Sequence, residues 1–373
     1  MGAGEGSADA SRGGGESGAG DAARLGEVLI VSPASTGGWR AADEELAGSL
    51  RRAGVRVQLV RARSPRQVRT FMLTDLVWAL ASRRAARAAM RRQPRAVIYS
   101  SSTASLLWPV PGAIRFDTPA AGNRPGRHGL WQRPVERRRL EQAPLLLPMS
   151  AAGLAECTSG SSRPGSWRAE LEARALVVPM PVEPSGPIDG ERDIAAITYA
   201  ANPAKKGTRR VVEAWLRVRR DTEQLVVAGC EPAELARAGV PLADEPAVRV
   251  AGRLEAGEYR ALLRRARVFV CAPRREDYGI AQLEALADGC QLVSAPAEGP
   301  YVALSLARQL DARLVDQDLG RALRNALDAA LPDYAVRART LLEPFSRATV
   351  DGLVASELVP RLLAGAGTVG TTG

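Results

Sequence analysis

The stretch Arg274-Arg-Glu-Asp-Tyr-Gly-Ile-Ala-Gln-Leu-Glu284 decides the fold that this sequence predicts. It follows a short apolar, β-branched run, Arg267–Cys271, which is typical of a buried strand. Apolar residues after it recur at helical spacing, and Asp288-Gly289 then predicts the end of a helix. The stretch therefore joins the carboxyl end of a strand to a helix, and in parallel α/β sheets ligands bind at such loops.

Several residues of this loop suit a nucleotide. Gly279 lets the backbone come close to a ligand, and free N–H groups near Ile280 and Ala281 suit a diphosphate. Glu276 lies in the loop, and Glu284 lies just over one turn into the helix, where its oxygens can accept both hydroxyls of a ribose. The alternative is that Glu276 is a solvated loop residue and Glu284 an exposed helix charge.

The two glutamates, with Tyr278-Gly279 between them, resemble the Glu-x7-Glu motif of retaining glycosyltransferases of family 4, glycosyl transferases group 1. The segment Ala285–Cys290 and the expected strand Gln291–Ser294 also fit that pattern. The resemblance implies a GT-B fold, in which two Rossmann-like domains face each other across a cleft. It also implies that Glu276 faces the donor sugar, that Gly279–Ala281 holds the diphosphate, and that Glu284 binds the ribose.

The composition bounds the class of protein. A chain of 373 residues is long enough for two domains, and 46% hydrophobic with 25% charged residues is ordinary for a globular protein. The net charge of +10 permits a nucleic acid, an anionic membrane or a phosphorylated substrate as partner. We expect no nucleic acid, because the sequence has no nucleic-acid-binding motif and no basic patch interleaved with aromatic residues.

The cysteines and apolar runs indicate a reducing cytoplasm. No Cys-x2-Cys pair occurs and the chain has one histidine, so we expect no metal site. The four cysteines are Cys157, Cys230, Cys271 and Cys290, of which the second and third end apolar runs and are expected to be buried. No signal peptide is expected, and the best candidate for a membrane span, Thr70–Ala81, is interrupted by Asp75.

Strands and helices alternate along the chain, which predicts parallel sheets with right-handed crossovers. We expect a disordered tail at 1–24, an N-terminal Rossmann-like acceptor domain at 25–180 and a Pro/Gly-rich linker at 181–192. A C-terminal donor domain at 193–343, a crossover helix at 344–365 and a disordered tail at 366–373 follow; the crossover rests on the family resemblance. The strands expected in the first domain are Glu27–Ser32, Val55–Val60, Arg95–Ser100, Ala113–Asp117, Pro144–Met149 and Ala175–Val178.

The strands expected in the second domain are Ile194–Ala200, Leu225–Ala228, Val248–Ala251, Val268–Cys271, Gln291–Ser294 and Arg313–Val315. No Gly-x-Gly-x-x-Gly follows any of them, which argues against an NAD or FAD site. We therefore expect no cofactor, with a nucleotide sugar as substrate.

A second loop adds positive charge to the expected donor site. Lys205, Lys206 and Arg209 lie at a predicted helix start after a strand, a sound place for an anion. Lys206 matches the lysine of the family's Lys-Gly element, which binds the donor diphosphate. The family's arginine is replaced here by Ala200, so that contact is missing or Arg209 or Lys205 supplies it. The alternative is a solvated basic helix start.

The first domain offers weaker candidates. The resemblance places the Gly37-Gly38 loop near the reacting sugar, although the glycines also suit a tight strand-to-helix turn. Many relatives carry a histidine at the end of the fourth strand, where this chain has Phe116-Asp117. Either Asp117 or the only histidine, His128, is expected to take over that contact with the donor sugar. Otherwise Asp117 caps a turn and His128 is a plain loop residue.

Two further features have competing interpretations. The helical stretch 64–93 is rich in arginine and apolar residues, so it predicts either peripheral contact with an anionic membrane or a solvated arginine face. Asp316-Gln-Asp318 is an Asp-x-Asp sequence, and we interpret it as turn or helix-start chemistry rather than as a metal site.

The sequence thus predicts a retaining, metal-independent hexosyltransferase that moves a sugar from a nucleotide-diphosphate donor to a hydroxyl of a glycan, glycolipid or small metabolite. Electrostatic contacts at Lys206 and at the helix start meet the charge of the leaving diphosphate. Two alternatives stay open: a nucleotide-sugar epimerase, and a catalytically inactive nucleotide-binding or scaffold partner of the same fold.

Overall fold

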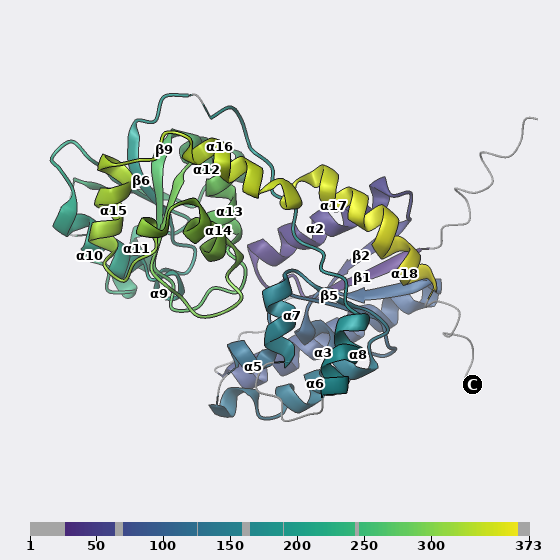
Figure 1. Ribbon diagram of the computed structural model, residues 1–373. Helices are drawn as coiled ribbons and strands as arrows, with labels where there is room; N and C mark the ends of the chain where they lie inside the picture. The colour runs from purple at the N-terminus through teal and green to yellow at the C-terminus, as the bar shows by residue number, and fades with distance from the viewer. Residues whose placement is uncertain are drawn as a thin grey trace, which may run out of the picture.

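The computed structural model describes residues 27–63, 70–124, 126–158, 165–188, 190–242 and 246–364. Within them the chain forms two parallel five-stranded sheets, each flanked by helices, in two separate domains (Figure 1). The prediction of two Rossmann-like domains is confirmed. The tails expected at 1–24 and 366–373, and residues 64–69 of the arginine-rich stretch, lie outside the described residues.

The first sheet has the strand order β2-β1-β3-β4-β5. Its strands are β1 (Val28–Ser32), β2 (Val57–Arg61), β3 (Ala96–Tyr99), β4 (Ala113–Phe116) and β5 (Leu146–Pro148). In β1 every residue is buried, as expected when helices cover both faces of a parallel sheet. The helices of this domain are α2 (Gly37–Arg52), α3 (Phe71–Ala89), η1 (Met90–Arg92), α4 (Ser102–Ser105), α5 (Ala120–Asn123), η2 (Gly126–Gly129), α6 (Gln132–Gln142), α7 (Ala151–Thr158) and α8 (Gly165–Ala173).

The second sheet has the order β10-β9-β6-β7-β8. Its strands are β6 (Ile194–Tyr199), β7 (Leu225–Ala228), β8 (Val248–Gly252), β9 (Ala266–Cys271) and β10 (Gln291–Ser294). The helices around it are α9 (Pro203–Lys206), α10 (Thr208–Val218), α11 (Pro232–Arg237), α12 (Ala256–Arg265), α13 (Ile280–Ala287), α14 (Val302–Leu310), η3 (Ala312–Leu314), α15 (Leu319–Asp328), α16 (Tyr334–Leu341) and η4 (Glu343–Phe345).

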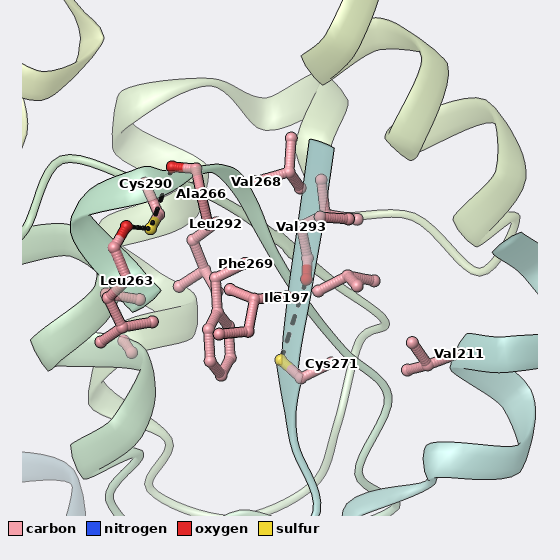
Figure 2. Packing of buried hydrophobic residues seen from close by; sticks show 14 of the residues in the cluster. Ile197, Val211, Leu263, Ala266, Val268, Phe269, Cys271, Cys290, Leu292 and Val293 are labelled. Atoms are coloured by element: carbon pink, nitrogen blue, oxygen red, sulfur yellow. Dashed lines mark hydrogen bonds between the residues drawn. The ribbon is translucent and has the colours of Figure 1, made fainter. Parts of the chain in front are cut away.

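The core of the second domain lies around β9 (Figure 2). Phe269 and Val268 of this strand are buried between helices on the two faces of the sheet. The thiol of Cys290 donates to the carbonyl of Leu263 at 3.1 Å, and Cys271 is also buried. Cys230 is buried too, so both expectations for buried cysteines are confirmed.

The chain crosses back to the first domain at its C-terminal end, through α17 (Arg347–Leu353), η5 (Val354–Leu358) and α18 (Val359–Ala364) (Figure 1). Val350, Val354 and Leu358 are buried in the same cluster as residues of β1 and α2. This burial removes apolar surface from water and fixes the segment on the first domain.

The prediction of strands at Ala175–Val178 and Arg313–Val315 is wrong. Residues 176–180 form no regular strand, and Ala175 makes only an isolated bridge with Leu146. The partner strand includes Pro148, which has no N–H to extend that pairing. Near Arg313 the chain forms the 3-10 helix η3 instead of a strand, because the Asp311 side chain accepts the Arg313 N–H and caps the turn.

Candidate functional site

The loop after β9, residues 272–279, is called the donor loop below. It ends at Gly279, whose φ of +91° places it in the left-handed region that glycine adopts without strain. A Cβ at this position would lie 2.8 Å from the ring of Tyr301, so the close packing also requires glycine. The turn aims the first N–H groups of α13, at Ile280 and Ala281, out of the end of the sheet.

Glu276 lies at the centre of the site. The residue is 8% exposed, and its Oε2 accepts hydrogen bonds from Lys206 Nζ at 2.5 Å and Gln282 Nε2 at 3.4 Å. Its backbone N–H donates to the carbonyl of Glu298 at 3.0 Å, which fixes the loop. The structure therefore brings together Glu276 and Lys206. Sequence reasoning missed Gln282, for which helical spacing gave no signal.

Lys206 reaches Glu276 because of the glycine that follows it. Gly207 has a φ of +67°, and a Cβ there would collide with the carbonyl oxygen of Ala272 at the end of β9. The Lys-Gly turn thus packs directly on the start of the donor loop. Arg210, which sequence reasoning also missed, donates to the same carbonyl at 3.4 Å.

The other basic residues of this loop point elsewhere. Arg209 is exposed, and its Nε lies 2.7 Å from Glu213 Oε1 on the surface of α10. Ala200 is fully buried. Lys205 is exposed, and its charge lowers the pKa of Asp117 in the first domain.

Glu284 lies one turn into α13, beside α12. Burial raises the pKa of this carboxyl group, an effect that the nearby Arg260 opposes. Arg260 Nη1 lies 3.8 Å from Glu284 Oε1, while Arg260 Nε donates to Asp288 at 2.6 Å. Arg260 is a third residue that sequence reasoning missed. Arg260 holds the Glu284 carboxylate in place. The Glu284 side chain is nevertheless partly exposed, as binding of a ribose would require.

Gly37 and Gly38, which the sequence placed in a loop, are the first residues of α2, and they meet the second domain. A Cβ on Gly38 would lie 3.6 Å from Cδ1 of Ile280, so the start of α2 lies against the start of α13. Trp39 packs against the core cluster of the second domain. Gly38 therefore lies beside the first residue of α13.

Asp117 follows β4 and faces the donor loop. Burial raises its pKa to about 7, and the nearby charge of Asp277 adds to this, whereas a hydrogen bond from the Thr118 N–H and the charge of Lys205 lower it. His128 is exposed in η2, which packs against α3. The residue after Asp117, Thr118, accepts a hydrogen bond from Arg275 of the donor loop at 2.8 Å.

Tyr278, the aromatic residue of the motif, has a structural contact. It is buried, and its hydroxyl accepts a hydrogen bond from the Met180 N–H at 3.0 Å. Burial raises the pKa of the phenol to about 12. The residue therefore ties the donor loop to the segment that connects the domains.

A pocket of about 460 Å³ lies between the domains on the side of loop 297–301. Gly299 of this loop packs on the carbonyl of Glu276, so the pocket shares a wall with the donor loop. Most lining side chains are apolar; the lining residues are Met149, Ser150, Ala151, Ala152, Val177, Pro179, Ala297, Gly299, Pro300, Tyr301, Val302, Leu304, Ser305, Arg308, Pro344 and Phe345.

Asp316 and Asp318 act at a helix start. Asp318 accepts the Arg321 N–H at 3.2 Å and caps α15, and Asp316 pairs with the Arg321 side chain at 2.5 Å. Within the part of the chain that the structure describes, no group of three or more His, Cys, Asp and Glu side chains is arranged to hold a metal ion.

Comparison with known proteins finds similarity in sequence for the second domain and in fold for most of the chain. The family model described as glycosyl transferases group 1 matches residues 192–333. The fold is similar to sucrose-phosphate synthase from Thermosynechococcus elongatus (16% identity, TM-score 0.61, covering 91% of this chain and 99% of that one). It is also similar to Anabaena HepE, solved in complex with UDP (13%, TM-score 0.62, 90% and 100%).

A third similar structure is α,α-trehalose 6-phosphate synthase from Burkholderia multivorans (12% identity, TM-score 0.61, covering 92% of this chain and 99% of that one). At these identities the structures show the fold, and the match to the family model is confined to residues 192–333. No curated protein matches the sequence. Among the described residues, no helix is both long and apolar enough to cross a membrane.

Proposed function

We propose that this protein transfers a sugar from a nucleotide-diphosphate donor to a hydroxyl acceptor with retention of configuration, because the family model described as glycosyl transferases group 1 matches residues 192–333. The observation that carries the proposal is the pair formed by Lys206 and Glu276 at the start of α13. One cation, one carboxylate and a row of free N–H groups meet there, and these groups suit a diphosphate joined to a sugar.

The leaving diphosphate needs positive charge as its bond to the sugar breaks. Lys206 Nζ and the backbone N–H groups at Gly279–Ala281 supply it in a partly buried setting, where fixed charges act most strongly. Glu276, which is held by Lys206 and Gln282, is assigned to the hydroxyls of the donor sugar. We propose that these groups carry the charge without a metal ion, so that excess chelator leaves turnover unchanged.

Glu284 is assigned to the ribose of the donor. Its carboxylate lies one turn beyond the N–H groups that hold the diphosphate, which is the order of groups in a nucleoside diphosphate. Arg260 keeps the carboxylate in place from the neighbouring helix. The Anabaena relative, solved in complex with UDP, supports this class of donor.

The first domain supplies the other half of the site. Gly38 lies against Ile280, and Asp117 faces Asp277 and Lys205, so the sugar and the acceptor hydroxyl are proposed to meet between these residues. Asp117 is assigned to the sugar or the acceptor. His128 of η2 stays the alternative candidate for this contact. Closure of the two domains would exclude water and favour transfer over hydrolysis.

The test is release of nucleotide from UDP-, GDP-, ADP- and TDP-glucose by purified protein, with and without candidate acceptors. Turnover that depends on Glu276 supports the proposal. The inactive-partner alternative predicts nucleotide binding without turnover, and the epimerase alternative predicts conversion of the donor to its epimer without an acceptor.

We also propose peripheral contact with an anionic membrane through α3. Met72, Leu73 and Leu80 of this helix expose large apolar side chains, and Leu130 in the loop beside η2 is 64% exposed. Arg84 and Arg87 of the same helix are also exposed. Apolar side chains bordered by arginines suit the interface of a bilayer that carries negative charge.

A further inference from the structure

The side chain of Arg275 joins the donor loop to the first domain. Its Nη2 donates to Thr118 Oγ1 at 2.8 Å and to the two carboxylate oxygens of Glu156 at 2.9 and 2.8 Å. Thr118 follows Asp117 after β4, and Glu156 lies on α7, so both partners belong to the N-terminal domain. The side chain of Arg275 is 20% exposed, and this partial burial strengthens a charge-assisted contact relative to a surface pair.

The first domain is shaped to receive this guanidinium. Thr118 Oγ1 also donates to Glu156 Oε2, so the two acceptors of Arg275 are joined before the domains meet. A Cβ on Gly122 would lie 2.5 Å from Arg275 Nη2 and would collide with Glu156 Oε1. Glycine at 122 therefore leaves the space in which the contact between the domains forms.

The other edge of the guanidinium fixes the donor loop. Arg275 Nε donates to Asp277 Oδ1 at 2.8 Å. On the backbone, residue 275 bridges with Glu298, whose carbonyl accepts the N–H of Glu276 at 3.0 Å. Arg275 and Asp277 thus flank Glu276 on both sides, and they hold the segment that points the Glu276 carboxylate at Lys206.

We propose that Arg275 is a positioning residue that couples the approach of the two domains to the orientation of Glu276. The inference rests on the proposed function, because Glu276 matters only if it contacts a donor sugar. When the domains meet, Glu156 and Thr118 take up the guanidinium, and the loop is fixed with Glu276 facing Lys206. When they separate, Arg275 loses three of its four hydrogen bonds and the loop is free to shift.

The chain offers a matched control for a merely structural ion pair. Arg347 of α17 binds Glu45 of α2 at 2.5 and 3.1 Å, with a side chain that is 38% exposed. This pair fastens the C-terminal segment to the first domain but does not touch the donor loop. A variant at Arg347 therefore removes a bidentate contact of the same kind without disturbing Glu276.

The experiment compares Arg275→Ala, Arg275→Lys, Glu156→Gln and Arg347→Ala with the unaltered protein. For whichever nucleotide-glucose turns over, we expect Arg275→Ala to lower kcat about 100-fold, since a misplacement of about 1 Å has that effect. The Kd for the nucleoside diphosphate should stay within about threefold, because Arg275 contacts neither the expected phosphate nor the ribose groups. The kcat of Arg275→Lys and of Glu156→Gln should lie between the values for Arg275→Ala and the unaltered protein. The kcat of Arg347→Ala should equal that of the unaltered protein.

The ratio of transfer to hydrolysis gives a second readout, and Arg275→Ala should lower it because the domains no longer close reliably around the sugar. A kcat within threefold of the unaltered protein, or an equal loss in Arg347→Ala, would overturn the proposal. Small-angle scattering of the nucleotide-free proteins tests the contact without turnover: Arg275→Ala and Glu156→Gln should enlarge the radius of gyration, and Arg347→Ala should not. A failure of every donor to react would count against the proposed function, whereas unchanged scattering would count against the contact itself.

Discussion

Lys206 Nζ lies 2.5 Å from Glu276 Oε2, although 70 positions separate the two residues in the sequence. They meet because β6 and β9 are parallel neighbours, so the loops at their carboxyl ends lie side by side. In the ligand-free protein the lysine is neutralised by the carboxylate. A bound diphosphate would compete for the same cation, which gives the pair a part in both binding and reaction.

This pairing predicts opposite effects on binding and turnover when Glu276 is changed to Gln. Sugar transfer should fall at least 100-fold, the size of loss seen when one preorganised polar group at a reacting centre is removed. Affinity for the nucleoside diphosphate should stay the same or rise, because Lys206 is released and a negative charge near the phosphates is lost. Steady-state kinetics and calorimetry measure the two effects.

The control for this variant is Glu213→Gln. It breaks the ion pair between Glu213 and Arg209 on the surface of α10, which does not involve Lys206. It should leave both turnover and affinity unchanged. Weaker nucleotide binding in Glu276→Gln would count against competition between the carboxylate and the diphosphate.

Asp117 predicts a pH dependence of stability. Its pKa is raised to about 7 in the folded protein, so between the ordinary carboxyl range and about pH 7 the folded state binds more protons at this group than the unfolded state. Stability must therefore fall as the pH rises through that window. Asp117→Asn removes the contribution, so the gain in Tm of the variant over the unaltered protein should increase from pH 4 to pH 7.

Glu136 also has a pKa raised to about 7, but it is present in both proteins. The difference in Tm between the two proteins therefore reports on Asp117. Asp277→Asn should act in the same direction through loss of the neighbouring charge. A gain in Tm that is constant across this range would show that Asp117 ionises normally in the folded state.

Gly279→Ala should disturb both the fold and the site. The residue has a φ of +91° and its Cβ would meet Tyr301, so we expect destabilisation by about 1–3 kcal/mol and loss of nucleotide binding. Gly257 lies in α12 with open space around its Cβ position, so Gly257→Ala should stabilise by about 0.5–1 kcal/mol. Denaturant unfolding of the two variants checks both signs. Equal effects of Gly279→Ala and Gly257→Ala on the free energy of unfolding would mean that the left-handed conformation at Gly279 is not required for stability.

The exposed apolar residues of α3 predict binding to anionic vesicles. Protein should sediment with vesicles of phosphatidylglycerol and phosphatidylcholine but not with phosphatidylcholine alone, and added salt should release it. The double variant Leu73→Ser, Leu80→Ser should reduce the bound fraction. The matched surface variant Val336→Ser, which removes an exposed apolar residue from α16, should not. Equal binding to both vesicle types would exclude an electrostatic contribution to membrane binding.

The sequence predicted the two sheets well, because buried parallel strands are continuous apolar runs separated by helical patterns. It also predicted that the segments around Gly279 and Gly207 join a strand to a helix. In both places an apolar run, a glycine and a helical pattern follow one another in the sequence. The two wrong strands have local causes, a proline without an N–H beside Ala175 and an aspartate cap before Arg313.

The contacts that the sequence could not supply are those between distant segments. Gln282 and Arg260 reach the two motif glutamates only through helix packing, and Arg275 meets Glu156 only when the two domains face each other. No spacing rule connects such positions. For the same reason the sequence left both Asp117 and His128 as candidates for one contact.

The most direct test of the account is calorimetric binding of UDP, GDP, ADP and TDP to the unaltered protein, to Glu284→Ala and to Lys206→Ala. We predict that one nucleoside diphosphate binds clearly more tightly than the others. Each variant should weaken it by about 10- to 100-fold, since a hydrogen bond to a charged group contributes about 1.5–3 kcal/mol. Absence of binding by all four nucleotides, or full affinity retained in both variants, would contradict the assigned donor site.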